Sequence, residues 1–413
     1  MRVLVVGAGI GGLACAQGLT RRGHDVTIVE RDRDVSSSGG YKLHLGVRAV
    51  AALRDLLAPA VFDTLLASAV GTRGFSIAVR DHRGRRLLRV TESATELTLD
   101  VDRITLRQIL ATGLDEHLLP GRSCLGWRVD GETVCAQLDD DSEVPAEVMV
   151  IADGAGSRLA ARLAGRPTST PCGLAGVAGR SPWQDLPPAT RALLSREPML
   201  AIGPGGTGLF ASAHDPVGRA ASRTARTRAA TTRPVAIWGL IAVEQALPPR
   251  PTRLGASELL DASTALLRRC HWADPMLDLL RLSEQESVSA FRFNAADPDD
   301  IATWPSGPVT ALGDAVHAMP PTGGQGAATA ILDAHALVER LPATARPETA
   351  TVVAGIRAYE TRLREQAAPA VRESLQPLRW IRAAATPAGA AALRLMTPVL
   401  AVGAALSEAA KRR

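Results

Sequence analysis

The stretch RVLVVGAGIGG at residues 2–12 decides the fold. Residues 2–6 are short, apolar and rich in β-branched side chains, which is typical of a buried parallel strand. The pattern of LACAQGLTRRG at residues 13–23 predicts a helix that ends near its last glycine. DVTIV at residues 25–29 predicts a second strand ending at Glu30. This order of strand, glycine turn, helix and strand predicts a Rossmann-like α/β domain.

The glycines of the turn have separate mechanical roles. Gly7 permits a tight turn out of the strand, Gly9 lets the backbone approach a pyrophosphate, and Gly12 lets helix and strand pack closely. The helix N-terminus offers unpaired N–H groups and partial positive charge to the phosphates. Glu30, with Arg31 beside it, is placed to accept hydrogen bonds from ribose hydroxyls and would repel a 2′-phosphate. We therefore expect FAD or NAD here. The alternative is a glycine-rich turn in another kind of α/β domain.

A second glycine cluster lies far down the chain, as GDAVHAMPPTGGQG at residues 313–326. It follows the apolar run VTAL and precedes a strong helix pattern at residues 327–341. The paired prolines and glycines hold a loop open for a flat ligand, and the helix N-terminus would stabilise negative charge on a reduced flavin. Asp314 is placed to hold a ribityl hydroxyl. A similar spacing, GPGGTG at residues 203–208, contains proline and precedes a strand pattern, which predicts a hairpin loop.

These two clusters resemble the FAD-dependent monooxygenases that include para-hydroxybenzoate hydroxylase and the tetracycline-modifying monooxygenases. IADGAGSR at residues 151–158 and DRITLR at residues 102–107 resemble two further motifs of that family, and all four stand in family order and spacing. The resemblance implies that Arg103 reaches the flavin and that Asp314 holds the ribityl and phosphate region. Gly326 and Ala327 then lie against the isoalloxazine, and Gly40 sits where the chain passes the flavin again. Ala328 departs from the family, in which many members have Asn.

The motif positions require a discontinuous FAD-binding domain, which we assign to residues 1–70, 96–165 and 291–375. Residues 71–95 and 166–290 are rich in strand patterns and are expected to form an inserted β-sheet that binds substrate over the flavin. Residues 376–413 are expected to form short C-terminal helices. Aromatic residues are only 3% of the chain, so those in the inserted strands are candidates for the pocket wall, with core packing as the alternative. They are Phe75, Phe210, Trp238, Phe291 and Phe293.

The resemblance implies a single-component monooxygenase. NADPH or NADH would reduce FAD, and O2 would form a C4a-hydroperoxyflavin that hydroxylates or epoxidises a small apolar or aromatic substrate, in secondary metabolism. The flavin is the catalyst, and no side chain is assigned as catalytic; His317 and His44 are candidates, each with a structural role as the alternative. A flavin-dependent reductase or dehydrogenase on the same scaffold, and a non-catalytic flavin-binding protein, remain as other hypotheses.

The composition of the chain argues against several other classes of protein. The 413 residues carry a net charge of +5 with the basic residues scattered, which argues against a nucleic-acid partner. The five cysteines include no C-x-x-C pair, so we expect no metal site or disulfide and a cytoplasmic location. No apolar run of about 18 residues is present, so we expect no membrane insertion. Lysine occurs only as Lys42 and Lys411. The substrate, the choice of nicotinamide and the oligomeric state stay open.

Overall fold

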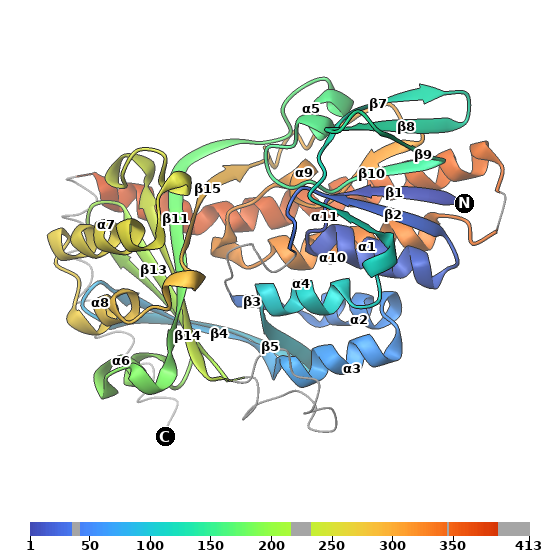
Figure 1. Cartoon of the computed structure of the whole chain (residues 1–413). Helices are drawn as coiled ribbons and strands as arrows, with labels where there is room; N and C mark the ends of the chain where they lie inside the picture. The colour runs from blue at the N-terminus through green and yellow to red at the C-terminus, as the bar shows by residue number, and fades with distance from the viewer. Residues whose placement is uncertain (35–41, 216–232, 345–346, 387–413) are drawn as a thin grey trace.

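A parallel five-stranded sheet forms the nucleotide-binding half of the molecule. The computed structural model describes residues 1–34, 42–215, 233–344 and 347–386. The strand order is β16-β10-β1-β2-β6, and every neighbouring pair is parallel. The strands are β1 (Arg2–Val6), β2 (Asp25–Glu30), β6 (Leu118–Pro120), β10 (Val148–Ile151) and β16 (Val309–Ala311). Their apolar runs are buried because helices pack against the sheet, as in other doubly wound folds (Figure 1).

Helices from both ends of the chain cover this sheet. Helix α1 packs closely against α10, which comes from the last quarter of the sequence. The helices of this half are α1 (Ile10–Arg21), α2 (Val47–Leu56), α3 (Pro59–Ser68), α4 (Arg103–Ala111), α5 (Arg158–Ala164), α9 (Asp314–His317) and α10 (Gly326–Arg340). A small antiparallel sheet of β7 (Cys124–Asp130), β8 (Thr133–Leu138) and β9 (Glu143–Ala146) lies beside them. The predicted βαβ unit and its discontinuous partner segments are thus present.

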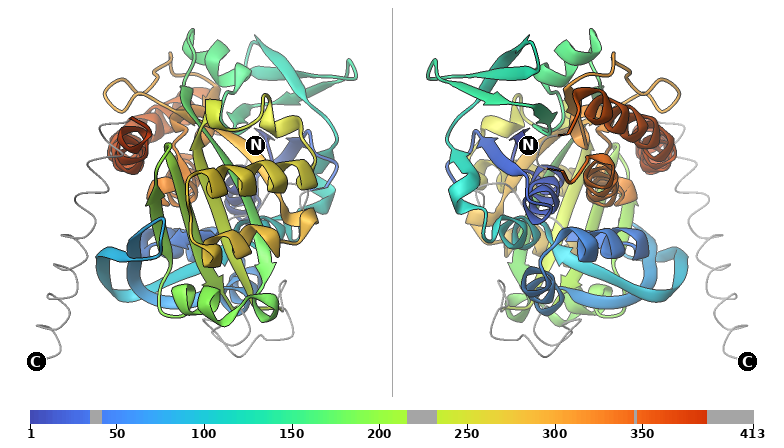
Figure 2. Two further views of the ribbon diagram at one scale, coloured as in Figure 1. Left: turned by 90° about the vertical axis from the view of Figure 1, so that its left-hand side faces the viewer. Right: turned by 90° about the vertical axis from the view of Figure 1, so that its right-hand side faces the viewer.

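An eight-stranded mixed sheet forms the second half, in the order β15-β11-β14-β13-β12-β4-β5-β3. Its strands are β3 (Lys42–Leu45), β4 (Val70–Asp81), β5 (Arg86–Asp102), β11 (Thr170–Pro182), β12 (Met199–Gly203), β13 (Thr207–His214), β14 (Val235–Val243) and β15 (Ser289–Ala295). Helices α6 (Pro188–Leu194), α7 (Ala256–Arg269) and α8 (Asp274–Arg281) cover its outer face (Figure 2). This sheet includes more of the chain than the sequence analysis assigned to it. Strand β3 and the end of β5 join the sheet, although the sequence analysis assigned their residues to the FAD-binding domain.

The hairpin predicted at residues 203–208 is confirmed. Strand β12 ends at Gly203 and β13 begins at Thr207, and the two residues pair across the turn. The three residues 204–206 form the turn, and Gly205 and Gly206 both have positive φ, 70° and 68°, which glycine adopts at little steric cost. This glycine motif therefore serves a strand connection and no nucleotide.

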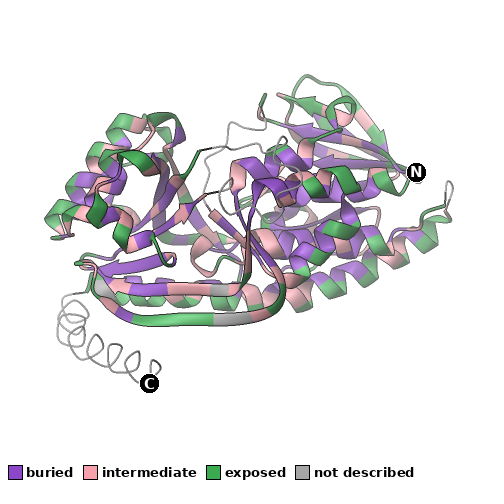
Figure 3. Cartoon of the chain, turned by 90° about the horizontal axis from the view of Figure 1, so that it is seen from below, coloured by how far each residue is buried: buried purple, intermediate pink, exposed green. Residues whose placement is uncertain are grey.

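One long helix, α11 (Thr349–Ala385), connects the two halves along the back of the molecule (Figure 1). It contacts α10 in one half and β12, β13 and β14 in the other. The helix runs through Pro369 and Pro377, so residues 376–385 continue it, and residues 387–413 of the expected C-terminal helical segment lie outside the described residues. Its buried side chains, including Val371, Leu378 and Ile381, hold it in place. Across the molecule, buried residues lie where sheets and helices face one another (Figure 3).

Candidate functional site

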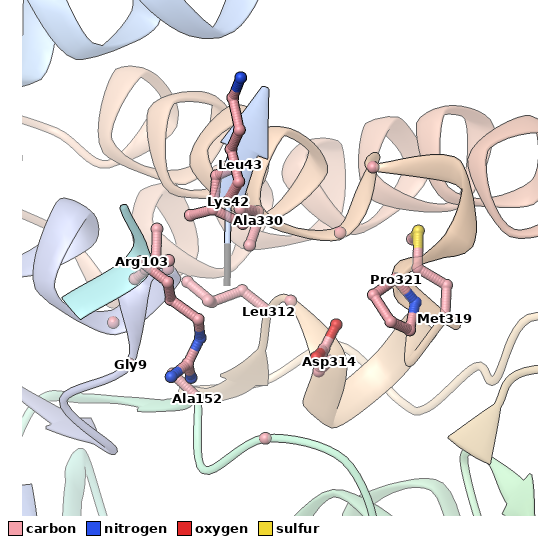
Figure 4. Close-up of a pocket in the computed structure, with 18 residues that line it drawn as sticks. Gly9, Lys42, Leu43, Arg103, Ala152, Leu312, Asp314, Met319, Pro321 and Ala330 are labelled. Carbon is pink, nitrogen blue, oxygen red and sulfur yellow. The ribbon is translucent and has the colours of Figure 1, made fainter. Parts of the chain in front are cut away.

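A pocket opens where β1, β10 and β16 end, between the N-terminus of α1 and the loop before α10 (Figure 4). Ligands in open parallel sheets bind at this edge, beyond the carboxyl ends of the strands. The lining comes from five stretches that are distant in sequence. They contribute Gly9, Ile10, Gly11, Gly12, Lys42, Leu43, Arg103, Ala152, Gly154, Leu312, Gly313, Asp314, Met319, Pro321, Gly324, Gly326, Ala327 and Ala330. The pocket thus joins both predicted glycine clusters.

The glycines of this turn are of two kinds: Gly7 and Gly12 are required by close packing within the protein, whereas Gly9 faces open space. Gly7 has φ 107°, and a Cβ there would lie 2.4 Å from the carbonyl oxygen of Ala152. A Cβ on Gly12 would lie 2.0 Å from the carbonyl oxygen of Gly7, so strand and helix pack too closely for any side chain. A Cβ on Gly9 would have no protein atom closer than 4.0 Å. The space that a side chain at position 9 would fill is therefore part of the pocket.

Glu30 lies at the end of β2 and is held by a network that the sequence analysis did not foresee. Its carboxylate accepts hydrogen bonds from the backbone N–H of Ala8 at 2.6 Å and of Asp32 at 2.9 Å. Arg107 on α4 approaches the same carboxylate at 3.2 Å and donates from Nε to the carbonyl oxygen of Ala8 at 2.7 Å. Both ionic side chains are buried. Arg107 therefore holds the Glu30 carboxylate against the glycine turn. The sequence signal for this contact was the position of Arg107 as the second arginine of the DRITLR motif at residues 102–107.

The late loop is anchored from behind by a buried ion pair. His317 on α9 contacts Asp333 on α10 through Nε2 and Oδ2 at 2.5 Å, and both side chains are fully buried. Asp333 also accepts a hydrogen bond from the backbone N–H of Gly313 at 3.0 Å. Burial opposes charge on the imidazole, but the carboxylate outweighs it and the pKa of His317 is raised above its ordinary value. His317 is not among the residues that line the pocket.

The other cofactor candidates occupy different positions around the pocket. Arg103 opens α4, whose N-terminus is capped by Asp102 accepting from the N–H of Thr105 at 3.0 Å, and its side chain points into the pocket (Figure 4). Asp314, Gly326 and Ala327 all line the pocket, whereas Ala328 does not. The Arg31 side chain is largely exposed, with Nε 3.8 Å from Oδ1 of Asp32. Gly40 lies outside the described residues.

The residues present fit a dinucleotide cofactor with a flat ring. The pocket has a helix N-terminus at each end, from α1 and from α10, with glycines where a ligand would touch the backbone. Gly154 faces the pocket with no atom near its missing Cβ, and Oδ1 of the adjoining Asp153 has no hydrogen-bond partner among the described residues. In the same described part of the chain, no cluster of His, Cys, Asp or Glu suits a metal ion.

The aromatic candidates for a substrate wall separate into three groups. Phe210 is half-buried on β13, on the face opposite the helix-covered core, and pairs across to Gly239. Trp238 is fully buried in the core beneath α8, and its indole N–H donates to Ser283 at 2.8 Å. Phe291 stacks on Phe293 at 5.4 Å beside α11. The strand register places Phe291 on the same face of the sheet as Phe210, and the side chain of Phe75 is outside what the structure describes.

His44 lies on β3, with Nδ1 2.7 Å from Oδ1 of Asp100 on β5. The other carboxylate oxygen of Asp100 lies 2.7 Å from the ammonium of Lys42. Burial opposes charge on this carboxyl, but Lys42 and His44 outweigh it and lower the pKa of Asp100 to about 2. Lys42 lines the pocket, and the sequence analysis did not select it.

Comparisons with known proteins agree with this geometry. Residues 283–374 match the FAD binding domain family, and residues 5–65 match the NAD(P)-binding Rossmann-like domain family. The chain is 25% identical over 382 residues to the chloroplastic zeaxanthin epoxidase of Solanum lycopersicum, covering 87% of this chain and 52% of the relative. It is 28% identical over 384 residues to the dual O-methyltransferase/FAD-dependent monooxygenase CTB3 of Cercospora beticola, covering 82% and 42%. The chain thus spans about half the length of the curated relatives it matches.

A solved structure shares almost the whole fold. The crystal structure of a putative FAD-containing monooxygenase from Photorhabdus luminescens superposes with a TM-score of 0.72 at 25% identity, covering 93% of this chain and 98% of that one. The predicted fold class and the resemblance to FAD-dependent monooxygenases are therefore confirmed. No helix within the described ranges is both long and apolar enough to cross a membrane.

Proposed function

We propose that this chain, which carries an FAD-binding domain and resembles FAD-dependent monooxygenases in sequence and fold, is an FAD-dependent monooxygenase that hydroxylates or epoxidises a small apolar or aromatic substrate. One observation carries the proposal: a pocket joins the N-terminus of α1 to the glycine loop before α10, and β3 at the edge of the second sheet lines it through Lys42 and Leu43. When bound, FAD supplies the activation of O2 for oxygen insertion, with NADPH or NADH as the transient reductant.

The residues of this chain would bind and orient the cofactor. The turn at Gly9 and the N-terminus of α1 would hold the pyrophosphate, because N–H groups and the helix dipole favour negative charge there. Beyond its two backbone donors and Arg107, the carboxylate of Glu30 retains acceptor capacity for ribose hydroxyls. Asp314 and Arg103 would contact the central part of the cofactor, and the N-terminus of α10 at Gly326 would stabilise negative charge at the ring.

The eight-stranded sheet would exclude water from the ring and provide the substrate wall. Phe210 and Gly239 share the face of the sheet that lies away from α6, α7 and α8, and no atom approaches the missing Cβ of Gly239 within 4 Å. An apolar substrate placed there gains free energy by leaving water, while the closed site prevents wasteful reaction of the reduced cofactor. This placement supports a substrate between sheet and cofactor.

Oxygen consumption tests the proposed reaction against its rivals. FAD-loaded protein is supplied with NADPH or NADH in an oxygen electrode, with a panel of aromatic and polyene compounds, and products are weighed by mass spectrometry. We expect substrate-stimulated oxygen uptake and a product heavier by one oxygen atom. Substrate reduction without oxygen uptake would establish a reductase or dehydrogenase, and nicotinamide oxidation that no compound stimulates would support a non-catalytic flavin-binding role.

A cytoplasmic location is part of the proposal. All five cysteines are free, and Cys15 and Cys172 are buried where no second thiol pairs with them. Unpaired buried thiols suit a reducing compartment. Fractionation of the producing cell, with an assay for the bound flavin, tests this point.

A further inference from the structure

The short helix α9 lies at the junction between the two halves of the molecule. Its first residue, Asp314, lines the cofactor pocket (Figure 4). Earlier in the sequence, the chain leaves the FAD-binding half between α5 and β11, and it returns to that half after β15. Each of these two crossings forms a hydrogen bond with α9 or with the residue that follows it. The helix therefore connects the pocket to the segments that lead into and out of the second sheet.

Thr168 forms the hydrogen bond on the outgoing crossing. It lies between α5 and β11, is 6% exposed, and donates from its hydroxyl to the carbonyl oxygen of Ala315 at 2.7 Å. On the return crossing, the backbone N–H of Ala296 donates to the carbonyl oxygen of Ala318 at 2.8 Å. Ala315 directly follows Asp314 in the sequence. The Thr168 hydroxyl thus binds the chain one residue away from a side chain that lines the pocket.

The position of α9 depends on contacts from outside the helix. The helix has only four residues, and the backbone N–H groups of Val316 and His317 both donate to the carbonyl oxygen of Gly313, at 2.9 Å and 3.0 Å. So short a helix is marginal by itself, because few of its backbone groups are paired internally. Asp333 holds its two ends, through the N–H of Gly313 and the ring of His317. Thr168 holds the middle of the turn.

The hydrogen bond between Thr168 and Ala315 is buried, so water does not readily replace it. Thr168 is 6% exposed and Ala315 is fully buried. Valine has nearly the shape of threonine but no hydroxyl donor, so Thr168→Val would leave the carbonyl of Ala315 without this partner. A buried carbonyl without a donor costs free energy, and α9 can lower that cost by shifting toward another donor. Asp314 would move with the helix, away from its place in the pocket.

We propose that Thr168 is a positioning residue for the cofactor, whose hydroxyl fixes α9 so that the Asp314 carboxylate is directed at FAD. Thr168 is not among the residues that line the pocket, so it acts through α9 and does not touch the cofactor itself. The inference rests on the proposed function, because it requires FAD in this pocket. It adds to the cofactor site a residue of the crossing to the second sheet, outside the four sequence motifs.

Equilibrium binding of FAD tests the inference without turnover. FAD is titrated into the full chain after removal of bound flavin, and the Kd is measured from the change in flavin fluorescence. We expect Thr168→Val to bind FAD about fivefold more weakly than the wild type, which corresponds to the about 1 kcal/mol of one buried hydrogen bond. Thr168→Ser keeps the hydroxyl and should restore the wild-type Kd. A Kd for folded Thr168→Val within about twofold of the wild type, less than half of that free energy, would overturn the inference.

A double-mutant cycle shows whether Thr168 acts through Asp314. Asp314→Asn alone should weaken FAD binding, because the carboxylate is the group that the cofactor would contact. If the Thr168 hydroxyl acts by directing this carboxylate, Thr168→Val should have little further effect on the Kd in the Asp314→Asn protein. The two substitutions are then strongly non-additive, as expected for residues that act together. Additive effects on the Kd would show that Thr168 acts by another route and would contradict the positioning role.

Thr190→Val is the matched control. Thr190 is fully buried on α6, and its hydroxyl donates to a carboxylate oxygen of Asp278 on α8 at 3.1 Å. Both helices cover the outer face of the second sheet, and neither residue lines the pocket. The control should lower the melting temperature and keep the wild-type Kd for FAD. Equal weakening of FAD binding by Thr168→Val and Thr190→Val would show a general loss of stability and would overturn the inference.

The failure of this inference and the failure of the proposed function are distinguishable. The inference is read from the Kd for FAD, and the reaction from oxygen uptake in the electrode. A protein that shows the expected Kd values and the non-additive cycle but consumes no oxygen would retain the positioning role and lose the monooxygenase. A protein that consumes oxygen with substrate, and whose Thr168→Val variant binds FAD as tightly as the wild type, would retain the monooxygenase and lose the positioning role.

Discussion

Substitution of Gly9 by valine should abolish flavin binding while leaving the fold intact. A Cβ at Gly9 would have no protein atom nearer than 4.0 Å, and its φ of −72° and ψ of 178° suit any residue. The added side chain would instead occupy the space in which the pyrophosphate must approach the N-terminus of α1. The protein therefore loses its ligand and keeps its packing.

The size of the effect follows from the contacts that the side chain would block. Two hydrogen bonds from backbone N–H groups to a charged phosphate contribute about 1.5 kcal/mol each, so their loss weakens FAD binding by at least about a hundredfold. Gly9 is also the N-cap of α1, and valine caps a helix less well than glycine, which costs about 1 kcal/mol of folding stability. The measurements are the flavin-to-protein absorbance ratio, the Kd after reconstitution and the melting temperature.

Gly46→Val is the matched control for this experiment. Gly46 is the N-cap of α2 in nearly the same conformation, with φ −68° and ψ 169°, and no atom lies within 4 Å of its missing Cβ. It does not line the pocket, so it should share the cost to the helix cap and keep full flavin content. A yellow, fully loaded Gly9→Val protein, or equal flavin loss in both variants, would refute the assignment of this turn to the pyrophosphate.

Three further substitutions examine the scaffold. Arg107→Met leaves the Glu30 carboxylate buried without its opposite charge, and should lower the free energy of unfolding by about 3 to 5 kcal/mol in urea titration; an unchanged midpoint would contradict the role of this pair. His317→Gln should destabilise by about 3 kcal/mol near pH 6 and by progressively less at higher pH. The folded pKa of His317 is raised, so its contribution is complete below the unfolded value of about 6.5 and disappears as pH rises through the folded pKa; a pH-independent difference would exclude the charged pair. Trp238→Ala should cost about 3 to 5 kcal/mol with normal flavin content per folded molecule, and selective flavin loss would instead place Trp238 at the site.

Local patterns predicted the elements that meet the cofactor. The β1 strand, the glycine turn, α1 and β2 are contiguous, and their periodicity and glycines are properties of neighbouring residues. Strand β14 likewise lies within residues 166–290, the segment predicted to be rich in strands. The end of α11 was not predictable, because proline is normally a helix stop, and only packing against two distant parts of the chain shows why this helix continues through Pro369 and Pro377.

The side-chain partners of the site could not be read from spacing. Arg107 and Glu30 are separated by 77 positions in the sequence, and Lys42 and Ser212 by 170. Such pairs depend on how distant segments of the chain are placed next to each other in the fold. This placement cannot be inferred from a single sequence. The rarity of lysine in an arginine-rich chain was the one signal at Lys42, since an ammonium with three rotatable donors differs from a planar guanidinium.

The buried polar groups of this protein differ in how fully they are paired. Glu30 meets Arg107, and Asp333 meets His317, so each end of the cofactor pocket is fixed by opposite charges before any ligand arrives. His214 is equally buried, yet both of its nitrogens lack partners among the described residues. A buried group without a partner costs folding free energy, and the chain gains nothing from it in the free state. The two ion pairs avoid this cost for the charges that they bury, because each of these charges meets an opposite one beside the pocket.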